Sequence, residues 1–318
     1  MIRVRERPRL VSAVGLGVYL LLGFTTPAIR PGTAVAQTVE RCPAPAFAAV
    51  PAGERMTILQ GNAWMLPSRP LLLPFQFSTD GRERAERLVQ VVRSCRPGIV
   101  LLEEVFEGAI VDLLERSLPE YRVFTSGGTD FTGTVNASGL VTLSRLPVER
   151  VVFQPFAALP ADAQAIEKLG RKGFLAVEVD APGFSGVVVN LHLYAHRQAA
   201  EVPITRRQLA EVVAFARAQE ATGRGVLLGG DFNLDRADLE AGLPDGWTAS
   251  LHGATYDAGA NPFASAGWNR GAASSRVRTI DFLVNSSPAA TTVRSAVLDR
   301  VPLSDHWFLE HEVVAAGG

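Results

Sequence analysis

The stretch GVLLGGDFNLD, residues 225–235, sets an apolar run directly against an acid, an aromatic residue, an amide and a second acid. A short apolar run beside glycine is typical of a buried strand. Alternate residues of a strand share a face, so we expect Asp231 and Asn233 to point the same way and Phe232 to turn into the core. Asp and Asn are also common turn formers, and this stretch alone does not separate a turn from a functional site.

Other apolar runs also end in polar residues that could join Asp231. These residues are Asn62 in QGNAW, Glu103 and Glu104 in LLEEV, Asn190 and His192 in VVNLHL, and Asp305 and His306 in LSDHW. Asp281 lies inside the strand-like segment RTIDFLV. Each residue alone has an ordinary interpretation as a turn former or a packing residue. The ordered series favours a site at one end of the strands, and Gly229 and Gly230 are expected to let the backbone turn sharply there.

The residue types in this series suit one kind of chemistry. Carboxylate and amide oxygens are ligands for a hard cation such as Mg²⁺. Histidine moves protons near neutral pH. A cation that neutralises a phosphate, a histidine that activates water and amides that hold phosphoryl oxygens together support metal-assisted phosphate hydrolysis.

Strand-like and helix-like segments alternate along the chain. Strands are expected at 55–64, 97–105, 139–145, 148–156, 173–180, 186–193, 224–233, 275–285 and 307–314. Helices are expected after an N-cap at Ser78, Thr79 or Asp80, and at 106–118 and 205–219. The four strands between 139 and 193 are expected to be neighbours, with DAPGFSG as a hairpin turn. The pattern predicts an α/β protein with two sheets packed face to face and helices outside.

The order of the motifs resembles the endonuclease/exonuclease/phosphatase superfamily, which includes DNase I and neutral sphingomyelinases. GGDFN and SDH are its most specific marks, NLHL and LLEEV support them, and the resemblance covers roughly residues 55–315. It implies a DNase I-like four-layer α/β/β/α sandwich, a two-sheet β-sandwich flanked by helices. It also implies hydrolysis of phosphate esters, usually with Mg²⁺ or another divalent cation.

The resemblance also implies a role for each residue. Glu104, Asn62 and Asp305 would be metal ligands. His306 would be the general base, Asp281 would orient it, and Asp231 and Asn233 would orient the water and the phosphate. His192 would bind the phosphate or assist the leaving group. Family members usually have Gln where Glu103 stands, and many have Thr where Leu191 stands.

Three segments resemble the sphingomyelinase branch of that superfamily. They are GRKGFLAVEV (170–179), SGLVTLSRLPV (138–148) and GATYDAGANP (253–262). Lys172 in the first is a candidate to bind the substrate phosphate, although a lysine that opens a strand is by default solvated. The resemblance implies a sphingomyelinase C-like phosphodiesterase acting on sphingomyelin or a related phospholipid. The alternatives are a DNase I-like endonuclease with a nucleic-acid substrate and a binding module without catalysis.

Three features of the sequence bear on how the protein contacts a lipid or a nucleic-acid substrate. The segment MLPSRPLLLPFQF (65–77) carries apolar residues that could contact a lipid surface, or could fold over the core. The segment 285–303 has no aromatic residue, whereas some secreted bacterial sphingomyelinases carry an aromatic-rich hairpin there. The net charge of −1 gives no general attraction to nucleic acid.

For the oligomeric state, we expect the protein to be a monomer.

The first 36 residues have the order of a secretory signal. Four arginines precede the apolar run 10–24, and small residues at 34 and 36 form a cleavage site. The alternative is an uncleaved anchor, but the run is shorter than the ~20 residues that a spanning helix needs. We expect residues 37–318 to be a single catalytic domain, either secreted or periplasmic. Cys42 and Cys95 are then expected to form a disulfide, the alternative being two buried thiols.

Overall fold

Strand β1, Arg55–Met65, runs through the middle of the first sheet and is buried on both faces. The computed structural model describes residues 42, 55–66, 78–126, 138–157, 159, 160, 163, 164, 167, 170–181, 184–265, 276–287 and 291–315. Along β1, Ile58 faces the second sheet, and Leu59 and Ala63 face the helices. Alternation with both faces apolar is what a central strand between two hydrophobic layers requires.

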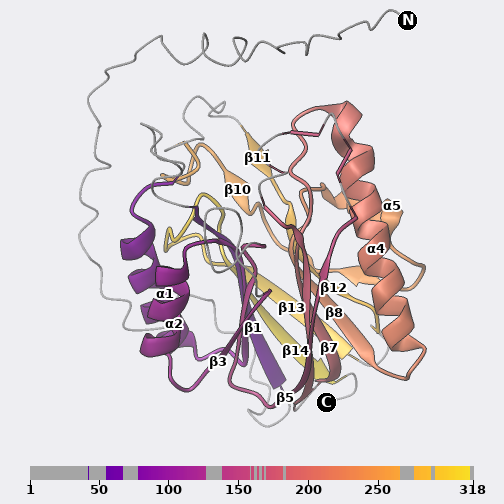
Figure 1. Cartoon of the computed structure of the whole chain (residues 1–318), viewed down its shortest axis with the longest axis horizontal. Coiled ribbons are helices and arrows are strands. Elements are labelled where there is room, and N and C mark those ends of the chain that lie inside the picture. Colours follow the sequence, from indigo (N-terminus) through magenta and orange to yellow (C-terminus); the bar gives the residue numbers. More distant parts are fainter. Residues whose placement is uncertain are drawn as a thin grey trace, which may run out of the picture. The chain divides into compact units, whose positions relative to one another are not determined.

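Two six-stranded mixed sheets form the centre of the fold (Figure 1). The first has the order β13-β14-β1-β2-β4-β3, and the second has the order β5-β6-β7-β8-β12-β9. The other strands of the first sheet are β2 Ile99–Val105, β3 Arg122–Thr125, β4 Val141–Ser144, β13 Thr291–Val297 and β14 Leu309–Ala315. The second sheet holds β5 Val148–Pro155, β6 Gly173–Ala181, β7 Phe184–His192, β8 Gly225–Asp231, β9 Thr248–Ala249 and β12 Asp281–Asn285. A small pair, β10 Tyr256–Asp257 and β11 Val277–Arg278, lies apart from both sheets.

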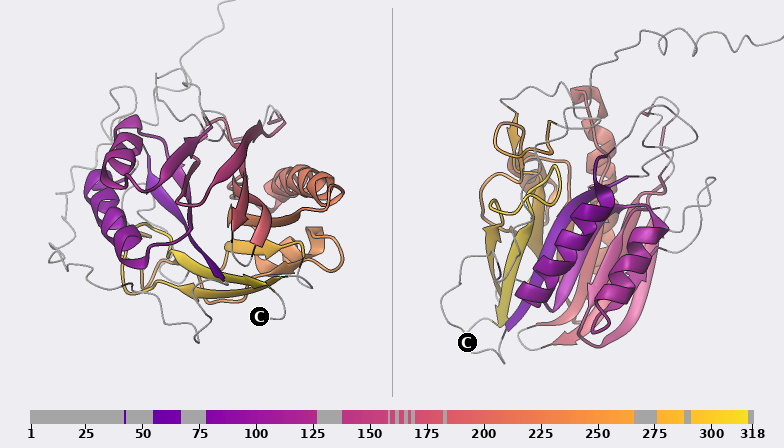
Figure 2. Two further views of the ribbon diagram at one scale, coloured as in Figure 1. Left: turned by 90° about the horizontal axis from the view of Figure 1, so that it is seen from below. Right: turned by 90° about the vertical axis from the view of Figure 1, so that its left-hand side faces the viewer.

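The sheets pack face to face and carry helices on their outer faces (Figure 2). Residues such as Ile58, Leu101, Val188 and Leu227 fill the space between the sheets. Helices α1 Gly81–Cys95 and α2 Gly108–Ser117 cover the first sheet; α4 Val202–Glu220 and α5 Arg236–Gly242 cover the second, with a short 3₁₀ helix at Ala199–Glu201. The layers are therefore α/β/β/α, and the expected DNase I-like sandwich is confirmed.

Helix α1 shows why the sequence adopts this arrangement. Ala85, Leu88, Val89 and Val92 recur at helical spacing and are all buried against the first sheet. Burying a side chain such as Leu88 stabilises the fold by roughly 1.5–3 kcal/mol. At its last residue, Cys95 forms a disulfide with Cys42, as expected from the sequence. Among the described residues, no helix is long and apolar enough to cross a membrane.

Two expectations about the strands were wrong, and four strands were not expected. β4 pairs with β2 and β3 in the first sheet, so it is not a neighbour of β5, β6 and β7. The expected strand 275–285 is two strands, because the Thr255 hydroxyl accepts from the amides of Ile280 and Asp281 and interrupts the pairing. The strands that were not expected are β3, β9, β10 and β13. The expected signal segment and most of the apolar segment 65–77 lie outside the described residues.

Candidate active site

Two pairs of parallel strands bring the candidate residues to one end of the sandwich. Asn62 on β1 pairs with Glu103 on β2, and His192 on β7 pairs with Asp231 on β8. Parallel strands run in one direction, so their carboxyl ends lie at the same edge of a sheet. A hydrogen bond from Asn62 Nδ2 to Asp231 Oδ2, 3.2 Å long, joins the two strand ends across the sandwich.

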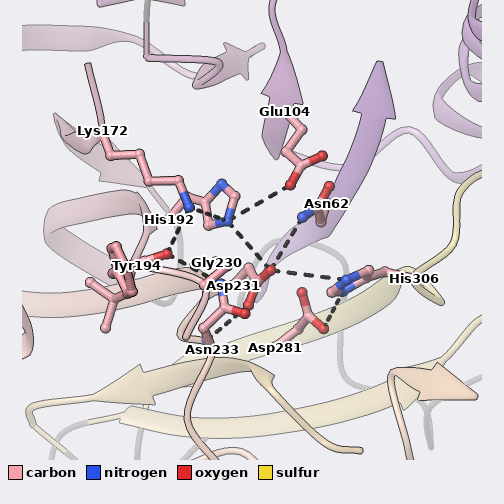
Figure 3. A network of polar contacts seen from close by, with 12 residues as sticks. Asn62, Glu104, Lys172, His192, Tyr194, Gly230, Asp231, Asn233, Asp281 and His306 are labelled. Atoms are coloured by element: carbon pink, nitrogen blue, oxygen red, sulfur yellow. Dashed lines mark hydrogen bonds and ion pairs between the residues drawn. The ribbon is translucent and has the colours of Figure 1, made fainter. Parts of the chain in front are cut away.

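The Oδ2 atom of Asp231 lies at the centre of this cluster. His192 Nε2 is 3.6 Å from it and His306 Nε2 is 4.0 Å from it. Figure 3 shows the two imidazole rings on opposite sides of Asp231, with Asn62 and Glu104 above it in that view. Four strands, β1, β2, β7 and β8, and the loop before β14 thus contribute side chains to a single small volume.

His306 is held by a buried carboxylate. Its Nδ1 lies 2.9 Å from Asp281 Oδ2, which leaves Nε2 directed to Asp231. The ring of Tyr256 packs edge-on against the imidazole, with 5.5 Å between ring centroids. Burial lowers the pKa of His306, but the carboxylates of Asp281 and Asp231 outweigh it and raise the pKa well above its ordinary value. The pair fixes the ring orientation that a general base needs.

The two glutamates at the end of β2 differ in their surroundings. Glu104 has a φ of 57°, and this left-handed conformation breaks the alternation that would send its side chain toward the helices. Its carboxylate reaches Asn62 and lies 3.9 Å from His192 Nε2. Glu103 is fully buried, and neither of its carboxylate oxygens has a hydrogen-bond partner among the described residues. Glu104 is therefore the glutamate that faces the site.

Asp305 adds another carboxylate on the same side. It stands next to His306 and is buried, and the Ser304 hydroxyl donates to its Oδ1 over 2.9 Å. Burial and the negative charge of Asp305 raise the pKa of Glu104 to about 7. The Asp305 carboxylate is thus close enough to oppose the ionisation of Glu104.

Lys172 lies inside the site and not on the surface. It precedes β6, and its side chain is 10% exposed. Nζ is 2.8 Å from Glu167 Oε2, 3.0 Å from the Leu193 carbonyl and 3.1 Å from His192 Nε2. Burial and the Lys172 charge lower the pKa of His192 well below its ordinary value. His192 is therefore a neutral hydrogen-bonding group at neutral pH.

In the stretch 225–235, Asn233 lies beside Asp231 and Phe232 lies in the core, as expected. Strand alternation is not the cause, because β8 ends at Asp231. Asn233 lies beyond β8 with a φ of 50°, and its backbone N–H donates to Asp231 Oδ1 over 2.8 Å. Phe232 is fully buried in the core. Gly229 and Gly230 do not form the turn. They stay in β8, where a Cβ on Gly229 would meet Gln60 Oε1 at 2.7 Å and one on Gly230 would meet the Leu191 carbonyl at 1.9 Å. The glycines permit close packing under the site.

The charges of the cluster fit a bound divalent cation. Three buried carboxylates, those of Asp231, Asp281 and Asp305, converge with the partly buried carboxylate of Glu104. Burial and Asp281 raise the pKa of Asp231 to about 6. Ligand atoms of Asp231, Asp281 and His306 lie within 4.8 Å of one another. Oxygen donors with unbalanced negative charge in a buried site are what Mg²⁺ or a similar hard cation requires.

The structure brings together all the residues proposed from the sequence for catalysis, metal binding and substrate binding. Asn190 is the exception among the polar strand-end residues, because it lies between the sheets and donates to the Leu102 and Val141 carbonyls. Three residues were missed: Glu167, which pairs with Lys172, Tyr256, which packs on His306, and the buried Arg84. Glu167 is five residues from Lys172 and Tyr256 lies in the segment GATYDAGANP, but neither contact follows from residue type, and three of the four carbonyls that Arg84 bonds are 20 or more residues away.

Comparison with solved structures finds the same fold at low sequence identity. Beta toxin from Staphylococcus aureus, a mutant solved with bound magnesium ions, aligns with a TM-score of 0.66 and 18% identity over 80% of this chain and 98% of that one. Sphingomyelinase C from Streptomyces griseocarneus aligns with a TM-score of 0.65 and 19% identity over 81% and 99%. Truncated TDP2 from Caenorhabditis elegans aligns with a TM-score of 0.61 and 20% identity over 82% and 98%.

A search of curated proteins by sequence gave no match. The sequence profile of the Endonuclease/Exonuclease/phosphatase family matches residues 59–306, from the buried centre of β1 to the candidate base His306. That span contains every residue of the cluster described above. The chain belongs to the endonuclease/exonuclease/phosphatase family.

Proposed function

We propose that this protein is an exported, metal-dependent phosphodiesterase of the sphingomyelinase C type, which hydrolyses sphingomyelin or a related phospholipid. The observation that carries the proposal is the placement of Asp231 between two histidines, one held by Asp281 and the other by Lys172. A base on one side and a hydrogen-bonding group on the other are what in-line attack of water on a phosphate ester needs.

The metal would be held by Glu104, Asn62 and Asp305. Their oxygens suit Mg²⁺, and the raised pKa of Glu104 reflects negative charge that a cation would balance. A bound divalent cation would neutralise the phosphate and polarise the bond under attack. Asn62 also keeps its hydrogen bond to Asp231, which links the metal side of the site to the water side.

His306 would accept the proton of the attacking water at Nε2. Asp281 holds Nδ1–H and stabilises the imidazolium that forms when the proton arrives. Asp231, 4.0 Å from His306 Nε2, would orient the water for attack. In the metal-free protein the surrounding carboxylates keep His306 protonated, so neutralisation of these carboxylates is what makes it available as a base.

His192, Lys172 and Asn233 would hold the phosphate from the other side. The Lys172 ammonium, which contacts Glu167, His192 and the Leu193 carbonyl, places a positive charge beside His192, and Asn233 Nδ2 donates to the same Leu193 carbonyl over 3.2 Å. Charged and amide donors fixed in a buried site stabilise developing negative charge on phosphoryl oxygens. Lys172 also lines a cavity of about 240 Å³ with Phe156, Leu159 and Gln208, which offers space for part of the substrate.

The choice of a phospholipid rests on two observations. Sphingomyelinase C from Streptomyces griseocarneus is among the similar structures, with a TM-score of 0.65. Segments around Lys172 also resemble the sphingomyelinase branch. The second candidate is a nuclease, because TDP2 from Danio rerio, solved in complex with a single-strand DNA product, also shares the fold with a TM-score of 0.62. Export rests on the signal-like residues 1–36 and on the Cys42–Cys95 disulfide.

A substrate panel tests the proposal. The purified protein would be incubated with sphingomyelin vesicles, phosphatidylcholine vesicles and plasmid DNA, each with Mg²⁺ and with a chelator. We expect Mg²⁺-dependent release of the phosphorylated headgroup from sphingomyelin. Nicking of DNA without headgroup release would replace the phospholipid with a nucleic acid, and no hydrolysis of any substrate would contradict the enzymatic function.

A further inference from the structure

Arg84 is a fully enclosed arginine that lies behind the site and not in it. It belongs to the first turn of α1, yet only 2% of its surface is exposed. Burial lowers its pKa to about 10, with Asp305 and Glu104 opposing that shift, so it stays charged at neutral pH. A buried charge is expensive unless every donor finds an acceptor, which makes the partners of Arg84 informative.

Its guanidinium bonds almost entirely to backbone carbonyls. Nη1 donates to the carbonyls of Ala63 over 2.6 Å and Leu303 over 3.0 Å, and Nη2 donates to Trp64 over 2.7 Å. Nε donates to the Thr79 carbonyl over 2.9 Å. These carbonyls belong to three separate segments, so one planar group ties the end of β1 to the start of α1 and to the loop before β14.

Two of those segments carry site residues at short range. Ala63 and Trp64 directly follow Asn62, and the Trp64 N–H donates to Asn62 Oδ1 over 3.1 Å, which fixes the amide that bonds Asp231. Trp64 has a φ of 49°, a left-handed conformation that a neighbouring constraint must hold. Leu303 lies two residues before Asp305. The guanidinium therefore sits at the joint between the Asn62 turn and the Asp305–His306 segment.

We propose that Arg84 is a positioning residue for this site, which holds Asn62 and the Asp305–His306 segment at the separation that metal binding and water activation require. The proposal rests on the proposed function for its catalytic part. The donors of an arginine are spread over three nitrogens in a rigid planar fork, whereas a lysine has three donors on one atom and cannot reproduce the four bonds that Nε, Nη1 and Nη2 of Arg84 make. The Trp64 and Phe263 rings flank the guanidinium at 5.2 Å and 5.4 Å and restrict it further.

The test compares Arg84→Lys with a matched control, Arg145→Lys. Arg145 also donates to backbone carbonyls, those of Pro97 and Arg96, but at the start of β2, the opposite end of that strand from Glu104. Mg²⁺ binding would be measured by calorimetry on the metal-free proteins. The His306 ring resonances would be followed by NMR, and kcat and KM would be measured with bis(p-nitrophenyl) phosphate.

We expect Arg84→Lys to weaken Mg²⁺ binding and to lower kcat by about 10- to 100-fold each, the range seen when outer partners of metal ligands are removed. KM should change little and the His306 resonances should shift, while Arg145→Lys changes none of these. Arg84→Ala should regain turnover when guanidinium ion is added well below denaturing concentrations.

Three results would overturn the proposal. The first is a folded Arg84→Lys protein with unchanged Mg²⁺ affinity, His306 resonances and kcat. The second is an equal loss in the Arg145→Lys control, and the third is a loss that follows the drop in melting temperature alone. If Arg84→Ala does not fold, the Arg84→Lys variant alone tests whether Arg84 positions the site. If the unmodified protein hydrolyses no phosphodiester, the proposed function fails. The Mg²⁺ affinity and the His306 resonances of Arg84→Lys still test the role of Arg84 in that case.

Discussion

The imidazole of His306 is held 2.9 Å from the carboxylate of Asp281, and Asp281 itself pairs with Asp231 across strands β12 and β8. The pairing of β12 with β8 therefore places both His306, the proposed base, and Asp231, the proposed water-orienting acid. This relationship depends on the fold alone, since Asp281 and His306 are 25 residues apart in the sequence.

Changing Asp281 to Asn should lower turnover without unfolding the protein. Asn keeps the size of the side chain but removes the charge that stabilises imidazolium at His306, so we expect kcat to fall by about 10²- to 10⁴-fold. The pKa of His306, followed by NMR in the metal-free protein, should move down toward its ordinary value because Asp281 is the main group that raises it. Unchanged turnover and an unchanged His306 titration would show that the pair has no catalytic part.

Metal binding should depend on pH in a defined direction. The pKa is about 7 for Glu104 and about 6 for Asp231 in the metal-free site, so both carboxyls are partly protonated below neutrality. A cation held by Glu104 would bind its ionised form, and its charge would also favour the ionised form of the neighbouring Asp231, so binding displaces these protons. Affinity for Mg²⁺ should therefore rise as the pH increases through 6 and 7 and level off above. Calorimetry in two buffers of different ionisation enthalpy would reveal the released protons, and a pH-independent affinity with no proton release contradicts the assignment.

The two adjacent glutamates should behave differently when each is changed to Gln. Glu103 is buried, and desolvation and Asp281 raise its pKa well above its ordinary value. The folded protein therefore keeps a proton there that the unfolded chain loses above roughly pH 4.5. Glu103→Gln should leave the melting temperature unchanged near pH 4 and raise it at pH 7 to 8, in chelator, with Mg²⁺ affinity preserved.

Glu104→Gln should show the opposite pattern, because this carboxylate faces Asn62 and His192. We expect it to weaken Mg²⁺ binding and to reduce hydrolysis strongly. If Glu103→Gln instead weakened metal binding while Glu104→Gln did not, the ligand would be Glu103, and the orientation of the β2 strand end would need to be revised.

Much of the fold and most of the site could be predicted from the sequence. Strand ends such as LLEEV and GGDFN place polar side chains after apolar runs, and this pattern is local. The membership of β4 in the first sheet could not be predicted, because its four residues are all buried. The sequence of a buried strand has the same apolar character in either sheet. The break at Thr279 and Ile280 depends on the hydroxyl of Thr255, about 25 residues away in the chain.

The details of the site that were missed depend on backbone conformation and on distant partners. The φ of 57° at Glu104 decides which glutamate faces the site, and no residue type marks it. The glycines of GGDFN were assigned to a turn, whereas their role is to let Gln60 and the Leu191 carbonyl approach β8. Arg84 looks like any charged residue of a helix that begins with several arginines and glutamates.

The disulfide should stabilise the fold without affecting the site. Cys42 and Cys95 are 53 residues apart, and closing a loop of that length lowers the entropy of the unfolded chain by an amount worth about 4 kcal/mol. Replacing both cysteines with serine should reduce the free energy of unfolding by up to that amount, as measured in urea. Cys95 is the last residue of α1, whereas Arg84 is in its first turn. Because the disulfide is at the end of the helix farther from Arg84, kcat at a permissive temperature should stay the same. A lost activity in a folded variant would place the disulfide among the groups that shape the site.

The most direct test of the central claim is the Mg²⁺-dependent hydrolysis rate of Asp231→Asn beside that of the unmodified protein, on the substrate that the panel identifies. Asp231 lies between both histidines and bonds Asn62, and replacing its buried carboxylate, whose pKa is about 6, with an amide should preserve the fold at neutral pH. The account predicts a folded variant, by circular dichroism and melting temperature, with nearly abolished hydrolysis. A folded Asp231→Asn protein that hydrolyses the substrate at the unmodified rate would contradict the assignment of the active site.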